Sequence, residues 1–351
     1  MLPEYVSISL SLSDIRGGSS ITKTRHYLTL AVLIVFQFAA ALAVYGADGG
    51  MKAASFVPQW LPQAQFAGFY VALDKGFYKK YGVDLKIITG GPERPPFVQL
   101  KEGRADFALM ELSSAIAMLA KGQRLINIAQ VVRQNSQMIV ARKASGIVTV
   151  DDLNGMKLSV WGGDYGDYSA IAFLKRHHIK AHIVNQSASV DLFMRGAVDA
   201  AVAMSYNDYH NILNSGLDPG DLVTFAFHDY GVDFPEDGLY VSEQRHTADP
   251  ELSCAFVRAS VEGWLYAFAH PDEALDIVMK YMIEAHVPSN KAHQKWMLTK
   301  MRELIIPDND TTQIGILRRE DYEHTAGQLK ADGLIETVTP YESFYKNCVK
   351  K

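Results

Sequence analysis

The sequence predicts an exported α/β protein of two lobes, each with a mainly parallel sheet flanked by helices, and a ligand cleft between them. Three observations predict this class: an apolar stretch near the N-terminus, strands that alternate with helices, and a restart of that alternation halfway along the chain. With 351 residues, of which 48% are apolar and 21% charged, the chain can bury the cores of two lobes. The net charge of -5 provides no basic field, so we expect no nucleic-acid partner.

Residues 1–46 have the pattern of a secretory signal peptide. Lys23 and Arg25 precede the uncharged apolar run "YLTLAVLIVFQFAAALAVYG", and small residues follow near its end. The run is about as long as a membrane span, so an uncleaved N-terminal anchor is the alternative. We expect cleavage and a periplasmic protein.

Two successive α/β units follow the signal. In the first, strands are expected at 53–60, 83–90, 105–111 and 124–132, and helices at 64–82, 95–104 and 112–122. In the second, strands are expected at 157–161, 181–185 and 197–204, and helices at 166–177, 189–196 and 205–216. From about residue 250 the chain becomes helical, with Asp249 as N-cap and a new helix start at Pro271.

The stretches "FVPQWLPQAQFAGFYVALDKGFYKKYGVDLKIITGG" and "LKEGRADFALMELSSAIAMLAKGQRLINIAQVVRQ" resemble the substrate-binding proteins of ABC importers. The resemblance covers residues 53–280 and is to the branch shared by thiamine-pyrimidine-precursor binding proteins and yeast-type pyrimidine synthases. It implies a type II periplasmic-binding-protein fold. The first lobe would comprise residues 51–142 and 241–351, and the second lobe residues 143–240.

The resemblance also implies a function. It predicts an extracytoplasmic binding protein for a small heterocycle, such as formyl-aminomethyl-pyrimidine or hydroxymethylpyrimidine, that delivers its ligand to a membrane permease with its ATPase. We expect a monomer without catalytic residues, metal or cofactor. The synthase branch uses pyridoxal phosphate and a cysteine-rich stretch, but the corresponding stretch "YGVDFPEDGLYV" contains no Cys. The remaining alternatives are a sulfonate, nitrate or flavin binding protein.

Candidate binding residues follow the predicted strands, because open α/β sheets bind ligands at the carboxyl ends of their strands. These positions are Trp60, Gly90–Gly91, 111–114, 161–168, Asn185 and 205–207. Trp60 is predicted to stack on an aromatic ligand, with packing between the lobes as the alternative. Glu111 and Ser113 are predicted contacts, although Ser113 suits helix capping equally well. Tyr206 and Asn207 are predicted to form the wall of the second lobe.

A glycine turn formed by Gly162, Gly163, Asp164, Tyr165 and Gly166 joins a predicted strand to a predicted helix. Its glycines would let backbone N–H groups approach a ligand. The nearby carboxylates would repel a phosphate, so we expect a neutral or cationic ligand here.

Two other residue types complete the expectations. Glu236 is predicted to accept hydrogen bonds from an aminopyrimidine, whereas the neighbouring Asp237 is assigned to a turn. The only cysteines are Cys254 and Cys348. An oxidising compartment would permit a disulfide between them, but the apolar helical pattern around Cys254 favours a buried thiol.

Overall fold

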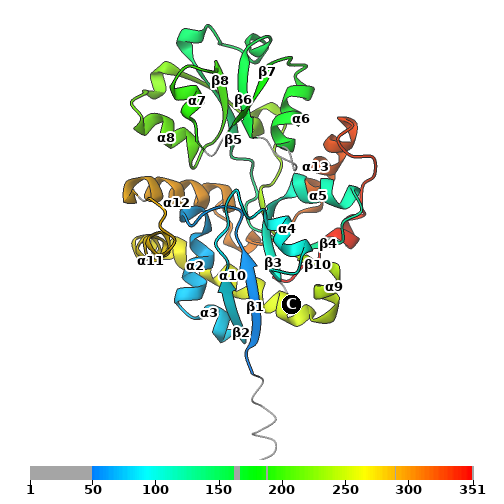
Figure 1. Ribbon diagram of the computed structural model, residues 1–351. Coiled ribbons are helices and arrows are strands. Elements are labelled where there is room, and N and C mark those ends of the chain that lie inside the picture. The colour runs from blue at the N-terminus through cyan, green and yellow to red at the C-terminus, as the bar shows by residue number, and fades with distance from the viewer. Residues whose placement is uncertain (1–49, 162–166, 187–188, 289, 350–351) are drawn as a thin grey trace, which may run out of the picture. The chain divides into compact units, whose positions relative to one another are not determined.

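The computed structural model describes residues 50–161, 167–186, 189–288 and 290–349. The predicted signal peptide and the glycine turn at 162–166 therefore lie outside the described residues. Within 51–351 the chain forms one compact unit that contains two five-stranded sheets, each in its own lobe (Figure 1).

The first lobe is built on a mixed sheet in the order β2-β1-β3-β10-β4. Its central strands β1 and β3 are parallel to each other, while β10 runs antiparallel between β3 and β4. The strands are β1 (Lys52–Val57), β2 (Val83–Ile87), β3 (Phe107–Glu111), β4 (Leu125–Gln130) and β10 (Asp237–Ser242).

The second lobe repeats this plan with the order β7-β6-β8-β5-β9. Here β6 is parallel to β7 and β8, and β5 runs antiparallel between β8 and β9. The strands are β5 (Gln137–Arg142), β6 (Lys157–Trp161), β7 (His182–Gln186), β8 (Ala200–Met204) and β9 (Leu222–Ala226). In each sheet the antiparallel strand enters from the other lobe, so two chain crossings connect the lobes.

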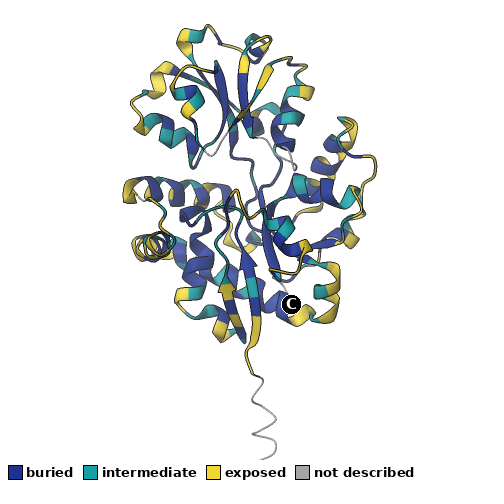
Figure 2. Ribbon diagram, in the orientation of Figure 1, coloured by how far each residue is buried: buried dark blue, intermediate teal, exposed yellow. Residues whose placement is uncertain are grey.

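Helices cover both faces of the sheets, and the central strands β3, β8 and β10 are largely buried (Figure 2). The helices of the first lobe and the C-terminal region are α2 (Ala67–Asp74), α3 (Phe77–Lys80), α4 (Pro96–Lys101), α5 (Leu112–Ala120), α9 (Glu243–Ala248), α10 (Pro250–Ala269), α11 (Pro271–Glu284), α12 (Lys291–Ile305), α13 (Arg319–Ala331) and α14 (Tyr341–Phe344). Those of the second lobe are α6 (Tyr168–Arg176), α7 (Asp191–Met194) and α8 (Asp208–Asn214). Among the described residues, no helix is both long and apolar enough to span a bilayer.

The sequence predicts most of these elements, with three differences. The helix expected at 64–82 is divided at Gly76, whose φ of 74° is left-handed backbone that glycine adopts without strain. No strand was predicted at the positions of β5, β9 and β10, and the assignment of Asp237 to a turn is wrong because it begins β10. The crossings precede β5 and β10, so the lobe limits lie a few residues before the predicted ones at 142 and 240.

Close packing of α2 on α10 anchors the first lobe. A Cβ atom on Gly263 would lie 2.1 Å from the carbonyl oxygen of Gly68, and one on Gly68 would collide with the ring of Trp264. Only glycine permits this approach, because any side chain would force the helices apart. The two helices therefore bury Trp264 and close one face of the sheet.

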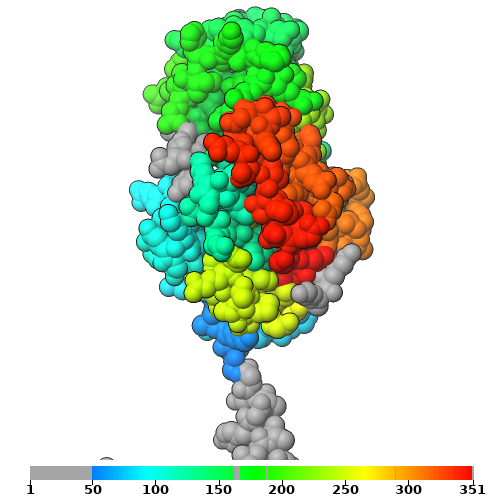
Figure 3. Space-filling view, turned by 90° about the vertical axis from the view of Figure 1, so that its right-hand side faces the viewer, coloured from blue at the N-terminus to red at the C-terminus, as the bar shows by residue number. Residues whose placement is uncertain are grey.

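The C-terminal segment runs along the first lobe and reaches the second (Figure 3). Helix α13 contacts α5 of the first lobe and α6 of the second. From α6, Lys175 donates to the carbonyl oxygen of Asp332, and Arg176 donates to Gln328. This segment therefore adds a third connection between the lobes.

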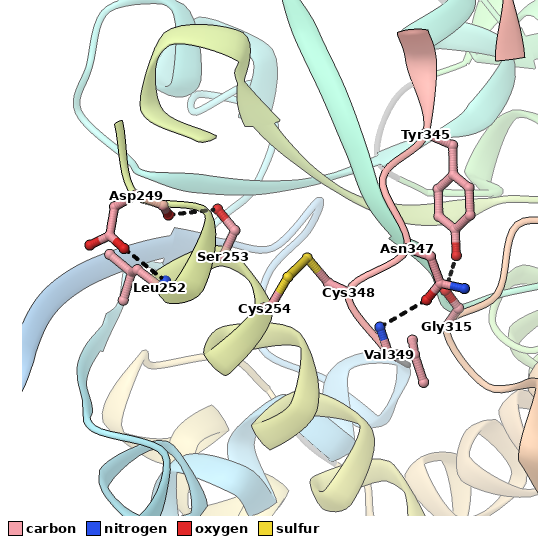
Figure 4. The surroundings of a disulfide bond; sticks show 9 residues. All are labelled: Asp249, Leu252, Ser253, Cys254, Gly315, Tyr345, Asn347, Cys348 and Val349. Carbon is pink, nitrogen blue, oxygen red and sulfur yellow. Dashed lines mark hydrogen bonds between the residues drawn. A yellow bond between two sulfur atoms is a disulfide. The ribbon is translucent and has the colours of Figure 1, made fainter. Parts of the chain in front are cut away.

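Cys254 and Cys348 form a disulfide, so the preference for a buried thiol is wrong (Figure 4). The apolar pattern around Cys254 does predict its burial in α10. It carries no information about the distant segment that covers this helix. That segment is the C-terminal tail, which brings the two Cα atoms to 4.5 Å.

Candidate functional site

A cavity of about 280 Å³ lies between the lobes, at the carboxyl ends of strands from both sheets. The first lobe contributes the segment after β1, residues 91–97 and the junction of β3 with α5. The second lobe contributes the start of β5, the end of β6 and the segment after β8. The described residues that line the cavity are Gln59, Trp60, Gln63, Gln65, Gly91, Pro92, Pro95, Pro96, Phe97, Leu109, Met110, Glu111, Ser114, Met118, Gln137, Trp161, Asp167, Met204, Tyr206, Asn207 and Asp208.

Two indole rings, one from each lobe, meet in the cavity wall. Trp60 lies in the segment after β1, and Trp161 is the last residue of β6. Their ring centroids are 5.9 Å apart and their planes are inclined at 81°, an edge-to-face arrangement. An aromatic corner of this kind suits a flat ring, which can stack on one indole and contact the edge of the other.

The first lobe places three carboxyl groups at or behind the cavity wall. Glu111 ends β3 and lies opposite Asp237 in the antiparallel register of β3 with β10. The Asp237 carboxylate accepts a hydrogen bond of 2.9 Å from Gln65 Nε2. Glu236 accepts from the backbone N–H and the hydroxyl of Ser136, at 2.6 and 2.7 Å.

Burial raises the pKa of all three groups. The pKa of Glu111 is raised by loss of water and by the charges of Asp167 and Asp237, against a hydrogen bond from Gln59. The pKa of Glu236 is raised by burial and by the charge of Glu111. Burial raises the pKa of Asp237 to about 7, although the Gln65 hydrogen bond acts in the opposite direction. A ligand that supplies N–H donors or positive charge would relieve this crowding of acids.

The second lobe adds two carboxyl groups that are fixed at helix starts. Asp167 is the N-cap of α6, and its Oδ1 accepts from the backbone N–H of Ala170 at 2.9 Å. Its Oδ2 is buried without a hydrogen-bond partner. Asp208 opens α8 and accepts from the N–H of Met204 at 2.9 Å, while burial raises its pKa to about 6. The second wall therefore also offers acceptors to a ligand.

The structure brings together four of the residues predicted to bind ligand. Trp60, Glu111, Tyr206 and Asn207 all line the cavity. Ligand contact itself stays a prediction for each of them. The predicted residues Gly162, Gly163, Asp164, Tyr165 and Gly166 lie outside the described residues.

Two predicted residues lie behind the described wall. Ser113 is 1% exposed and its hydroxyl has no hydrogen-bond partner, whereas the next residue, Ser114, lines the cavity. The predicted capping role of Ser113 is also wrong, because the N-cap of α5 is Glu111. Glu236 is buried and bonded to Ser136 rather than exposed in the wall.

Several lining residues are missing from the predicted binding set. Trp161 and Asp167 belong to the candidate positions 161–168, although neither was named as an individual contact. The helix was predicted to begin at 166, whereas Asp167 is the N-cap of α6. No local sequence pattern marked Gln137 or Asp208 as a cavity residue. Gln137 begins the crossing strand β5, and Asp208 opens a helix, as many aspartates do. Their place in the wall depends on how distant strands align.

The described lining residues combine carboxyl groups with amides, and the buried N–H of Trp161 Nε1 is a donor without a partner. None of them is Lys, Arg or His, so no basic side chain among them could pair with a sulfonate, nitrate or phosphate. Besides the carboxyls, the buried amide oxygen Oε1 of Gln137 has no partner, nor has Oε1 of Gln59. Within the described part of the chain, no group of three or more His, Cys, Asp or Glu side chains is placed to hold a metal ion.

Comparison with solved structures defines the class of protein. The chain has the fold of the periplasmic binding proteins, as in the aliphatic sulphonate binding protein SsuA of Escherichia coli. The TM-score is 0.64 at 15% identity, over 83% of this chain and 91% of that one. At this identity the similarity shows the fold alone.

The family follows from the sequence. The model of the family described as "NMT1/THI5 like" matches residues 63–274, and the chain belongs to this family. It is 22% identical to a formylaminopyrimidine-binding protein of Halalkalibacterium halodurans, over 92% of this chain and 98% of the relative. It is also 23% identical to the riboflavin-binding protein RibY of Chloroflexus aurantiacus, over 74% of this chain and 79% of the relative.

Proposed function

We propose that this protein is the extracytoplasmic substrate-binding component of an ABC importer and binds an aminopyrimidine of the thiamine-precursor type. Formyl-aminomethyl-pyrimidine and hydroxymethylpyrimidine are the candidate ligands. The ligand would be held between the lobes and released to a membrane permease driven by its ATPase. The protein would work as a monomer in the periplasm after removal of its signal peptide.

The observation that carries the proposal is a cavity between two lobes that combines two indoles with hydrogen-bond acceptors. An aminopyrimidine is flat and presents an amino group, so it can stack on Trp60 or Trp161 while its N–H groups meet carboxylates such as Glu111. The volume of about 280 Å³ lies just below the roughly 300–1,000 Å³ typical of ligand sites. That size favours a single small ring over a flavin.

The experiment is a calorimetric titration of the mature protein with three classes of ligand. Formyl-aminomethyl-pyrimidine is expected to bind more tightly than thiamine, riboflavin or taurine. Native mass spectrometry of protein purified from a periplasmic extract would report any small molecule that copurifies. Tight binding of taurine or nitrate, without a response to any pyrimidine, would overturn the proposal.

We propose further that binding is not followed by chemistry. The segment that corresponds to the cysteine-rich stretch of the synthase branch contributes β10 and its preceding turn, and it contains no Cys. Incubation with pyridoxal phosphate and iron is therefore expected to give no pyrimidine product. A borohydride-trapped adduct on Lys75 or Lys79 would contradict this expectation.

A further inference from the structure

A cluster of aromatic and polar side chains joins α8 of the second lobe to α12 of the first lobe. The Nδ1 atoms of His210 on α8 and His293 on α12 are 2.8 Å apart, and the two rings are stacked with centroids 5.0 Å apart. His210 also stacks on Trp296 of α12, with ring centroids 4.7 Å apart. The indole N–H of Trp296 in turn donates to the carbonyl oxygen of Ser205 at 3.1 Å.

This cluster reaches the cavity through Asn207. His293 Nε2 lies 3.0 Å from Asn207 Oδ1, and Asn211 Nδ2 donates to the same oxygen at 3.3 Å. A carbonyl oxygen only accepts, so His293 carries a hydrogen on Nε2 in this contact. The amide oxygen of Asn207 is thereby occupied on the side of the cluster, and its amide N–H groups stay free to donate to a ligand.

We propose that His293 is a positioning residue that fixes Asn207 in the cavity wall, and that its pairing with His210 makes closure of the lobes depend on proton concentration. The proposal rests on the proposed binding function for its role in ligand affinity. Its basis in the structure is the pair of contacts that His293 makes with two residues of the opposite lobe, His210 and Asn207.

The number of protons that the two histidine rings can hold explains why closure of the lobes depends on pH. Two nitrogen atoms 2.8 Å apart form a hydrogen bond with one proton between them, and two protons there would repel. The pair can therefore be neutral or carry one positive charge, because a further proton finds a place on His210 Nε2. Because His293 Nε2 already carries a hydrogen, the neutral pair has His210 Nδ1 donating to His293 Nδ1. The side chain of Asn214 also lies 3.1 Å from His210 Nδ1. Protonation of both rings on both nitrogens breaks the contact.

Acidification is expected to weaken closure of the lobes. In the open protein each ring can be fully protonated near its ordinary pKa of about 6.5, whereas the closed protein holds one proton fewer. Burial lowers the pKa of His210, and burial together with the charge of His210 lowers the pKa of His293. Closure is therefore supported above about pH 6.5 and is lost as the pH falls below it.

Charged groups on the packed elements are engaged elsewhere. On α8, Asp208 accepts from the N–H of Met204. On α12, Lys291 pairs with Asp276 of α11, Lys300 pairs with Glu303 and lies over the ring of Trp296, and Lys295 is exposed. None of these charged groups forms a hydrogen bond or an ion pair with the ring of His210 or His293. The two rings are therefore the titrating pair at this contact.

The first experiment measures affinity for formyl-aminomethyl-pyrimidine against pH in matched variants. Wild-type affinity should fall by up to about tenfold per pH unit below about pH 6.5. His293→Gln keeps an amide donor for Asn207 but cannot be protonated, so its acid loss should be smaller than that of the wild type. His293→Ala removes the contact and should weaken binding by about three- to tenfold above about pH 6.5, and the difference from the wild type should shrink as the pH falls below that value. His182→Gln, at an exposed position of β7, is the control and should follow the wild-type curve.

The cavity carboxyls titrate in all variants, so the difference between curves isolates the histidine pair. Identical pH dependence in wild type and His293→Gln would overturn the proposal while leaving the binding function intact.

A second experiment needs no ligand. It measures small-angle scattering of the ligand-free wild type and His293→Gln from about pH 8 to about pH 5. The wild-type radius of gyration should increase on acidification, and that of His293→Gln should increase less. An equal increase in radius of gyration for wild type and His293→Gln would overturn the proposed role of the histidine pair in closure, even if aminopyrimidines fail to bind.

Discussion

The two walls of the cavity are held in place by contacts of very different sequence range. In the first lobe, Gln65 bonds to Asp237 across 172 residues, and Ser136 bonds to Glu236 across 100 residues. In the second lobe, the Asp167 carboxylate is bound by an N–H three residues away, and Asp208 by one four residues away. The carboxyl groups of the first wall are therefore placed by contacts between distant segments, while those of the second wall are placed by helix starts within its own lobe.

This difference suggests a division of labour between the lobes. The long-range contacts tie Asp237 and Glu236 to strand β10 and to both crossings. If the lobes close on a ligand as we propose, we expect the first wall to be formed beforehand and the second wall to complete the cavity. A ligand would then meet the first wall first.

The largest expected effect compares the two indoles. Trp60→Ala should weaken binding of formyl-aminomethyl-pyrimidine by about one to two orders of magnitude, because stacking of a base on an aromatic ring contributes roughly 1–3 kcal/mol. Trp161→Ala should cost less, since its wall contributes only after closure. Calorimetry measures both, with Leu265→Ala on the exposed face of α10 as the control. An equal loss for the two variants would remove the proposed division between the lobes.

A second prediction compares the carboxyls of the two walls through stability. The pKa of Asp237 is raised to about 7 and that of Asp208 to about 6. Above the ordinary carboxyl pKa of about 4, the folded protein therefore holds more protons than the unfolded chain. The free energy of unfolding should fall as the pH rises through that window, and the raised pKa of Glu111, about 8, extends the fall beyond about pH 7.

Thermal unfolding of the ligand-free protein tests this prediction. Asp237→Asn keeps an oxygen for Gln65 and should reduce the fall between about pH 6 and pH 7, to which Glu111 and Glu236 also contribute. Asp208→Asn should retain that part and reduce the fall at lower pH. Superimposable curves for the two variants would show that the walls do not differ in this way.

The smallest expected effect concerns two adjacent serines at the start of α5. Ser113→Ala removes a buried hydroxyl without a partner and should change ligand affinity by less than about twofold. Ser114→Ala removes a hydroxyl from the cavity wall and should weaken binding by about threefold. A larger loss for Ser113→Ala would restore the role that the sequence predicted for it.

The sequence predicts features that depend on local patterns and misses features that depend on contacts between distant segments. Alternating strand and helix patterns predict both lobes, and the position after a strand correctly places Trp60, Glu111 and Tyr206 at the cavity. Local rules fail where the partner is far along the chain. No pattern near Glu236 shows that Ser136 covers it, so the predicted ligand contact lies instead behind the wall.

Glycine gives a second example of this limit. The helical pattern from 64 to 82 contains Gly68 and Gly76, and nothing local distinguishes their roles. Gly76 divides the helix, whereas Gly68 stays helical and permits contact with α10. The distinction depends on Gly263, which is almost two hundred residues away in the sequence.

The bond between Cys254 and Cys348 has a consequence for the order of events during export. The segment that it closes includes α11, α12 and α13, and therefore contains the histidine at the lobe contact and a connection between the lobes. Oxidation of these thiols requires an oxidising compartment. A disulfide typically stabilises a protein by about 2–4 kcal/mol. If the chain is exported as we propose, the reduced precursor is less stable by that amount and easier to thread unfolded through a translocation pore. The mature protein gains this stability only on the far side of the membrane.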